Sequence, residues 1–119
     1  WDLAADQKLS EQFIEKFKDK VNWNFVSKYQ KLSEPFIEKH KDRVDWELIS
    51  AHQRLSEQFI EKYQDRVDWN AISKRQRLSP EFVTKHIDKI TESIFSNRCY
   101  RKFPDSLKLL LKQKFNREV

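Results

Sequence analysis

The sequence predicts an all-α protein, a short α-solenoid of tandem 23-residue helix-turn-helix repeats with a C-terminal helical cap. The same residue types return every 23 positions, which is typical of stacked repeats. Gly is absent, Pro occurs three times and 36% of the residues are charged, so helix formers dominate and turns that need a positive φ must be rare. The four Trp, three Tyr and nine Phe indicate a chain that folds, because unfolded chains are poor in aromatic residues.

Columns of equivalent residues define the repeat. They are Trp23, Trp46 and Trp69; Leu9, Leu32, Leu55 and Leu78; Val26, Ile49 and Ile72; Ser27, Ser50 and Ser73; Gln7, Gln30, Gln53 and Gln76; Ser10, Ser33, Ser56 and Ser79; Phe13, Phe36, Phe59 and Phe82; and Asp19, Asp42, Asp65 and Asp88. Trp1 lies one residue closer to Leu9 than the later tryptophans lie to their leucines, so the first repeat carries a deletion or begins differently. We expect four helical repeats in residues 1–91, at about 1–22, 23–45, 46–68 and 69–91.

Each repeat is predicted to form two short helices. The first begins at the tryptophan, after an N-cap at Asn22, Asp45 or Asp68, and ends near the repeated glutamine. The second begins after the cap serine, and Pro35 and Pro80 fit its first turn, where no intrahelical amide bond is lost. Helices of about eight residues are unstable alone. Neighbouring repeats must therefore stabilise them by burying Trp, Ile, Leu and Phe in one shared core.

Residues 92–119 depart from the pattern and predict a cap. A degenerate fifth helix is expected to begin after Thr91 as N-cap, with Ile94 and Phe95 pointing inward; Glu92 takes the tryptophan position and Cys99 the glutamine position. A charge in place of Trp indicates that no further repeat packs there. The last helix, opened by Phe103-Pro104-Asp105-Ser106, is expected to cover the end of the stack with four apolar side chains, Leu107, Leu110, Leu111 and Phe115.

Two columns change residue type while their neighbours stay constant, and these are the candidate partner-binding residues. One holds Tyr29, His52 and Arg75, and the other holds Phe17, His40, Tyr63 and His86. Solenoids use such faces for recognition, although variation is equally what unconstrained exposure produces. The constant columns have structural interpretations: Trp belongs to the core, and Gln is a buried amide that satisfies loop backbone between repeats.

Positive charge is concentrated in the cap. Residues 91–119 hold seven Lys or Arg against three Asp or Glu, whereas residues 1–90 are nearly balanced. The candidate contacts to phosphate or to an acidic protein surface are Arg98, Arg101, Lys102, Lys108, Lys112 and Lys114, with Arg117 nearby. The alternative interpretation is a solvated helix face whose cations suit the C-terminal end of the helix dipole.

Composition and motifs give little support to catalysis, cofactors or metals. Without Gly there is no glycine-rich phosphate loop, the carboxylates recur with the structural period, and the three histidines have no ligand spacing. The single Cys99 excludes an internal disulfide. No apolar run is long enough to span a bilayer, and no basic signal-peptide start is present, so we expect no membrane association and an intracellular location, not secretion. Met is absent and residue 1 falls inside the repeat pattern, so we expect a piece of a longer or processed protein.

The phrase "ISAHQRLSEQFIEKYQDRVDW" resembles the short Ile-Ser-x-x-Gln-x-Leu-Ser-Glu-x-Phe-Ile repeats of largely uncharacterised proteins from giant double-stranded DNA viruses and some phages. The similarity covers residues 1–91, and residues 92–119 depart from it. The resemblance implies a viral protein that acts as a binding or scaffolding module, and it transfers no catalytic residues.

Three functional hypotheses follow. The first is a non-enzymatic protein–protein interaction or scaffolding module that binds a host factor or forms part of a virion. The second is a nucleic-acid-associated protein that holds phosphates with the basic cap. The third is a spacer without a partner of its own. The oligomeric state stays open.

Overall fold

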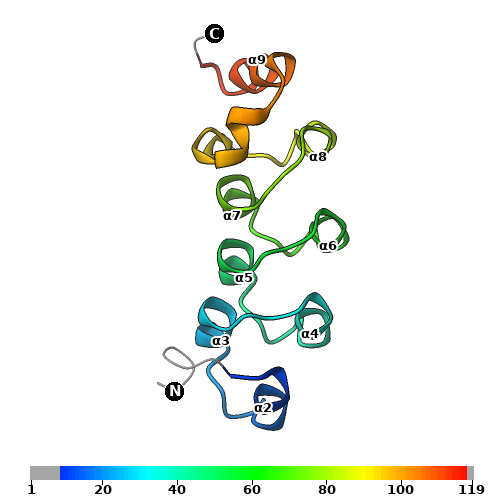
Figure 1. Ribbon diagram of the computed structural model, residues 1–119, viewed down its shortest axis with the longest axis vertical. Coiled ribbons are helices and arrows are strands. Elements are labelled where there is room, and N and C mark those ends of the chain that lie inside the picture. The colour runs from blue at the N-terminus through cyan, green and yellow to red at the C-terminus, as the bar shows by residue number, and fades with distance from the viewer. Residues whose placement is uncertain (1–8, 118–119) are drawn as a thin grey trace. The chain divides into compact units, whose positions relative to one another are not determined.

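The computed structural model describes residues 9–117, and the chain divides into two compact units, residues 1–68 and residues 69–119. The described residues form α-helices and two 3₁₀ helices and contain no β-strand (Figure 1). The predicted first members of the Trp and Gln columns, Trp1 and Gln7, lie outside the described residues.

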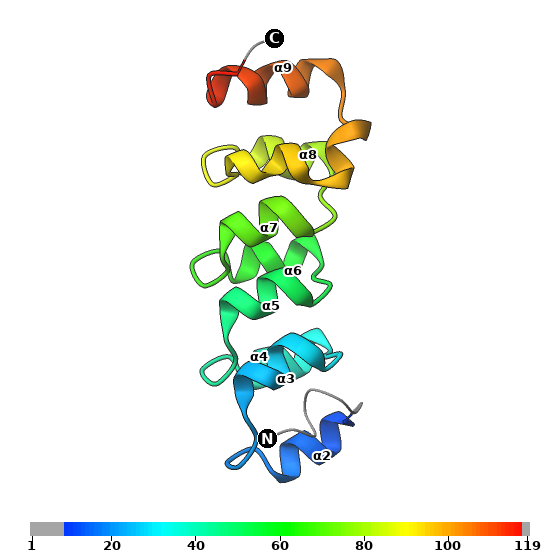
Figure 2. The ribbon, with the colours of Figure 1, turned by 90° about the vertical axis from the view of Figure 1, so that its left-hand side faces the viewer.

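The first unit holds the helices α2 (Glu11–Lys16), α3 (Trp23–Tyr29), α4 (Glu34–Lys39), α5 (Trp46–His52) and α6 (Glu57–Lys62). They form two layers, with α3 and α5 side by side in one layer and α2, α4 and α6 in the other (Figure 1, Figure 2). The most deeply buried side chains are the aliphatic residues of each helix: Ile14, Val26, Ile37, Ile49 and Ile60. The core therefore runs between the two layers, as in an α-solenoid.

Side-chain caps explain why such short helices begin where they do. Asn22 Oδ1 accepts from the backbone N–H groups of Asn24 and Phe25, at 3.0 and 3.3 Å, and Asp45 caps α5 in the same way. The cap serines Ser10, Ser33 and Ser56 each accept from the N–H group three residues later. Each cap satisfies backbone donors that would otherwise stay free at a helix start.

The repeated glutamines join one repeat to the next through buried hydrogen bonds. Gln53 Nε2 donates to the carbonyl oxygens of Ser27 at 2.8 Å and Gln30 at 2.6 Å, and its Oε1 accepts from Leu32 N at 3.1 Å. Gln30 Oε1 accepts from Leu9 N at 2.7 Å. One amide thus satisfies three backbone groups of the preceding repeat, which confirms the structural interpretation of this column.

Two further columns link successive repeats. The hydroxyls of Ser27 and Ser50 accept from the N–H groups of Asp45 and Asp68, at 3.1 and 3.0 Å. Each aspartate comes directly before the tryptophan that begins the next repeat. The carboxylate of Glu11 accepts from both the N–H and the hydroxyl of Ser33, and Glu34 does the same for Ser56. The constant polar residues are therefore used inside the stack.

The second unit holds α7 (Trp69–Arg75), α8 (Pro80–Lys85), the 3₁₀ helices η1 (Glu92–Ser96) and η2 (Arg98–Lys102), and α9 (Asp105–Lys114). Helix η1 packs against α7, as the next repeat's first helix would. Pro80 takes the position held by Glu11 and Glu34 in the earlier repeats. The last repeat has thus lost the carboxylate of this link.

The first helix of the degenerate fifth repeat, η1, is a 3₁₀ helix and not an α-helix. This corrects the position that the 23-residue register predicted for the buried amide. Thr91 is its N-cap and Ile94 is fully buried, as expected, but Phe95 is only half-buried. The buried amide is Asn97, whose Nδ2 donates to the carbonyls of Ser73 and Gln76 at 2.8 Å each. Cys99, predicted to replace the glutamine, lies two residues too late. Five 3₁₀ residues rise about 10 Å, close to seven α residues, so the amide comes two positions earlier.

Helix α9 caps the second unit with Leu107 and Leu111, which are 5% and 0% exposed. Leu110, predicted to face inward, is 41% exposed because it lies on the outer side of α9 with Leu109. The helix ends in a Schellman motif: Asn116 has φ 56°, its N–H donates to Gln113 O, and Arg117 N donates to Lys112 O. Asn116 is the one positive φ among residues 9–117, as a chain without Gly requires.

These observations confirm the fold class. Tandem helix pairs stack within each unit, and a helical cap follows them. The helices are too short to be stable alone, so contacts between successive repeats must supply most of their stability.

Candidate partner-binding surfaces

The first variable column lies at the surface. Tyr29, His52 and Arg75 are each the last residue of their helix, α3, α5 and α7, and each is exposed. Tyr29 is 48% exposed, and its ring lies 5.9 Å from the ring of Phe25 and 5.1 Å from Lys28 Nζ. An exposed aromatic ring beside a cation combines two features that are common at protein interfaces.

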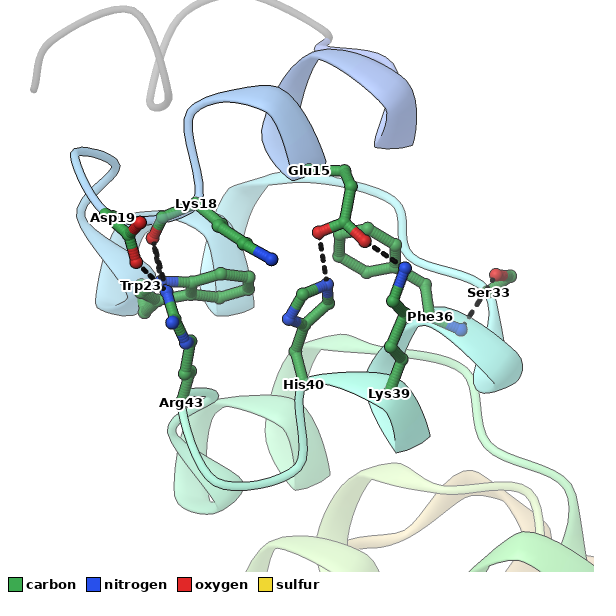
Figure 3. A network of polar contacts seen from close by, with 9 residues as sticks. All are labelled: Glu15, Lys18, Asp19, Trp23, Ser33, Phe36, Lys39, His40 and Arg43. Carbon is green, nitrogen blue, oxygen red and sulfur yellow. Dashed lines mark hydrogen bonds and ion pairs between the residues drawn. The ribbon is translucent and has the colours of Figure 1, made fainter.

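The second variable column is largely inside the stack, so it is not the exposed face that the sequence suggested. His40, Tyr63 and His86 are 6%, 9% and 8% exposed, and Phe17 is half-buried. Aromatic rings enclose these residues. Figure 3 shows His40 between Trp23 and Phe36, with ring centroids at 5.0 and 4.7 Å. The column therefore varies within a packed interface between repeats.

The charge state of His40 follows from this enclosure. Burial lowers the pKa of His40 below its ordinary value of 6.5, against the opposing effect of Glu15, whose Oε2 lies 3.1 Å from His40 Nε2. The Glu15 carboxyl has a lowered pKa because the Lys39 ammonium donates to it, with a further contribution from His40. A carboxylate of α2, in the preceding repeat, thus faces the histidine ring, as Figure 3 shows.

Tyr63 explains how the residue type can change at this position. Its hydroxyl donates to Glu38 Oε1 at 2.6 Å, and its ring lies against Trp46 and Phe59, as His40 lies against Trp23 and Phe36. Burial, with the bond to Glu38, raises the pKa of Tyr63, while hydrogen bonds from Lys62 and Tyr63 lower the pKa of Glu38. Histidine and tyrosine thus each place a polar atom near the equivalent glutamate of the preceding repeat, Glu15 for His40 and Glu38 for Tyr63.

The tryptophans were predicted to be core residues, but they are only half-buried. Trp23 and Trp46 lie at the edge of the stack, where each indole N–H donates to a loop carbonyl, Lys18 O or Lys41 O, at 2.9 Å. The same carbonyls accept from Arg43 and Arg66 of the next repeat, and these arginines also pair with Asp19 and Asp42. The indoles therefore help to hold the loops at this edge, and Val, Ile and Leu side chains are the most deeply buried.

The basic residues of the cap divide into two groups. Arg98, Arg101, Lys102 and Lys114 are exposed, whereas Lys108 and Lys112 on α9 are partly buried. Lys114 Nζ donates to Ile87 O, so this lysine also holds α9 against the turn after α8. Lys108 Nζ donates to Arg101 O at 3.2 Å, which ties α9 to η2.

An open pocket of about 690 Å³ lies beside α9, and its lining is Phe95, Tyr100, Lys108, Lys112 and Arg117. The sequence indicated the three cations as part of a basic cap, but it gave no sign that Phe95 and Tyr100 would join them. Their meeting depends on the 3₁₀ turns of η1 and η2, which have no distinctive pattern in the sequence.

Within residues 9–117, no group of three or more His, Cys, Asp or Glu side chains could hold a metal ion. No helix in the same range has the length and apolar character needed to cross a bilayer. The fold and its surfaces define a helical-repeat protein. Comparison with protein families, curated proteins and solved structures found no match to this chain.

Proposed function

We propose that the chain is a non-enzymatic protein-binding module whose contact residues are Tyr29 and His52 on the first unit; Arg75, the member of the same column on the second unit, is exposed as well. The supporting observation is that this variable column is exposed, while the constant polar columns are used in bonds between repeats. Exposed tyrosine and arginine are the residue types that most often dominate protein interfaces. Exposed residues whose type changes from one repeat to the next suit recognition of one particular partner.

The internal use of the carboxylates supports a role without catalysis. Glu11 and Glu34 bind the cap serines, and Glu15 and Glu38 bind the next repeat's lysine and its aromatic or imidazole side chain. A catalytic pair needs two acids whose environments separate their pKa values around an accessible site. These acids instead recur at structural positions.

The resemblance to repeats of giant-virus and phage proteins extends the proposal to the partner. It favours a host protein or a virion component, and with it a location in the host cytoplasm or in the particle. The net charge of +5 favours a partner with an acidic surface, because complementary charge speeds encounter.

The test is capture of partners from infected-cell and host-cell lysates with the full chain, at about 150 mM and about 500 mM salt and with nuclease treatment in parallel. A chain carrying Tyr29→Ser and His52→Ser is compared with a control carrying Gln12→Ser and Gln58→Ser, both exposed positions on α2 and α6. We expect one protein to be retained by the control at high salt and after nuclease, and its affinity to fall at least about tenfold in the test variant.

The competing function, nucleic-acid association, is favoured by one observation: Arg98, Arg101 and Lys102 are all exposed on η2. Phosphate contacts release counterions, so such binding weakens steeply as salt rises. Recovery of nucleic acid alone, lost at about 500 mM salt and unaffected by Tyr29→Ser, would replace the proposed function with this one.

A further inference from the structure

The pocket beside α9 collects positive charge in one place. Lys108 and Lys112 lie four residues apart on α9, which puts both side chains on the same face, and the Schellman motif brings Arg117 back beside Lys112. Like charges at this spacing repel, and both lysines are partly withdrawn from water. An anion bound between them would remove this repulsion.

Existing partners leave part of this positive charge available. The Glu92 carboxylate is the acidic group that meets the pocket cations: its Oε1 accepts from Arg117 Nε at 3.1 Å and Nη2 at 3.0 Å. Arg117 Nη1 stays available, as do two of the three Lys108 protons. Within the described residues no side-chain partner of Lys112 is present. Among the acidic groups of residues 9–117, the Glu92 carboxylate is therefore the one that pairs with a pocket cation, and it pairs with Arg117.

The other lining residues are aromatic and carry an unsatisfied polar group. The ring of Phe95 lies 5.2 Å from that of Tyr100, edge to face, and the Arg117 guanidinium stacks 4.3 Å from the Phe95 centroid. Lys108 Nζ lies 5.6 Å from the Tyr100 ring. The Tyr100 hydroxyl is buried and has no hydrogen-bond partner among the described residues. Buried hydroxyls normally have one, so a missing partner is a second sign of a ligand.

We propose that this pocket binds a compact ligand that joins a phosphate monoester to a planar ring, with Lys108, Lys112 and Arg117 holding the phosphate and Phe95 and Tyr100 contacting the ring. Two sources share this chemistry, a phosphotyrosine side chain and a mononucleotide. A single pocket lined by aromatic rings suits one terminal phosphate. A nucleic-acid backbone would instead be bound by a row of cations along its length. The pocket shares no residue with the Tyr29 column, so the inference goes beyond the proposed contact surface.

The test is an NMR titration of the full chain with four probes: phenyl phosphate, AMP, ribose 5-phosphate and inorganic phosphate. We expect phenyl phosphate or AMP to shift the amide signals of residues 95–117, with a dissociation constant at least about fivefold below that of the two ringless probes. A lower constant for phenyl phosphate assigns the pocket to phosphotyrosine, and a lower constant for AMP assigns it to a nucleotide.

Variants separate the pocket from general charge attraction. Lys112→Gln removes a pocket cation, and Lys102→Gln removes the same charge from an exposed position on η2 outside the lining. We expect Lys112→Gln to weaken the ring phosphate about tenfold or more and Lys102→Gln to change it less than about twofold. Tyr100→Phe keeps the ring and removes the hydroxyl, so it should weaken the same probe while thermal unfolding stays unchanged.

Three results would overturn the inference: no signal change with either ring phosphate, equal constants for ringed and ringless probes, or equal losses in Lys112→Gln and Lys102→Gln. Binding of an oligonucleotide that weakens equally in both lysine variants would assign the charge to a nucleic-acid surface instead. These small-molecule titrations do not involve Tyr29 or His52, so their failure leaves the protein-binding proposal standing.

Discussion

Histidine and tyrosine exchange at one internal position without changing the packing around it. His40 and Tyr63 each lie between a tryptophan and a phenylalanine, and each approaches a glutamate of the preceding repeat. The two side chains respond differently to a fall in pH: His40 must gain a proton in a buried site, whereas Tyr63 stays neutral. The column should therefore determine how the fold responds to pH.

Because the pKa of His40 is lowered in the folded state, the unfolded state binds more protons between that pKa and 6.5. The stabilising contribution is fully present above pH 6.5 and is lost as the pH falls through the folded-state pKa. His40→Tyr should remove this slope, and Tyr63→His should add a second one. The measurement is the free energy of unfolding in urea from about pH 7.5 to about pH 5.

His52 and His86 are common to all three proteins, so their effects cancel in the differences between curves. Equal slopes in the original chain and in His40→Tyr would show that protonation of His40 is tolerated, with the ion pair to Glu15 offsetting the burial cost.

At the scale of the element, the replacement of an α-helix by the 3₁₀ helix η1 sets the end of the repeat pattern. The 3₁₀ form reaches the same length with fewer residues, and it brings Asn97 to the place where Gln53 lies in its repeat. The shorter Asn side chain satisfies the same pair of carbonyls. The cap thus keeps the hydrogen bonds of a repeat after its sequence has diverged.

Asn97→Ala should lower the free energy of unfolding by about 2 to 3 kcal/mol, because the carbonyls of Ser73 and Gln76 then lose a buried donor. Cys99→Ala is the matched control at the position that the 23-residue register would select, and its effect should be below about 1 kcal/mol. Urea unfolding followed by circular dichroism checks both. A larger loss in Cys99→Ala would restore the predicted register.

At the scale of the whole molecule, most of the net charge belongs to the last quarter of the sequence. Residues 91–119 contribute four of the five net positive charges, while the repeats pair Lys and Arg with carboxylates of the preceding repeat. These charges of the repeats are therefore structural, whereas Arg98, Arg101 and Lys102 of the cap are exposed on η2.

A triple variant, Arg98→Gln with Arg101→Gln and Lys102→Gln, should change the free energy of unfolding by less than about 0.5 kcal/mol, since all three side chains are exposed. Its elution from heparin should move to lower salt, while capture of a protein partner through Tyr29 should persist. Thermal unfolding, heparin chromatography and the lysate capture measure the three effects. Loss of the protein partner would move the interface to the cap.

The sequence by itself determined the repeat, the helix starts and the all-α class, because caps and periodic apolar positions act through neighbours a few residues away. It also predicted that the Gln column consists of buried amides, and it identified the two columns whose residue type varies. It could not tell which of these two columns is exposed, since exposure depends on which side chains of the next repeat cover them.

Only the tertiary structure decided that Tyr29 stays open while His40 and Tyr63 are enclosed, that the tryptophans lie at the edge, and that Asn97 replaces Cys99. It alone joined Phe95 and Tyr100 to the cations of α9. The physical reason is the same in each case: these outcomes depend on helix rise and on contacts between residues about 20 positions apart, which no local pattern encodes.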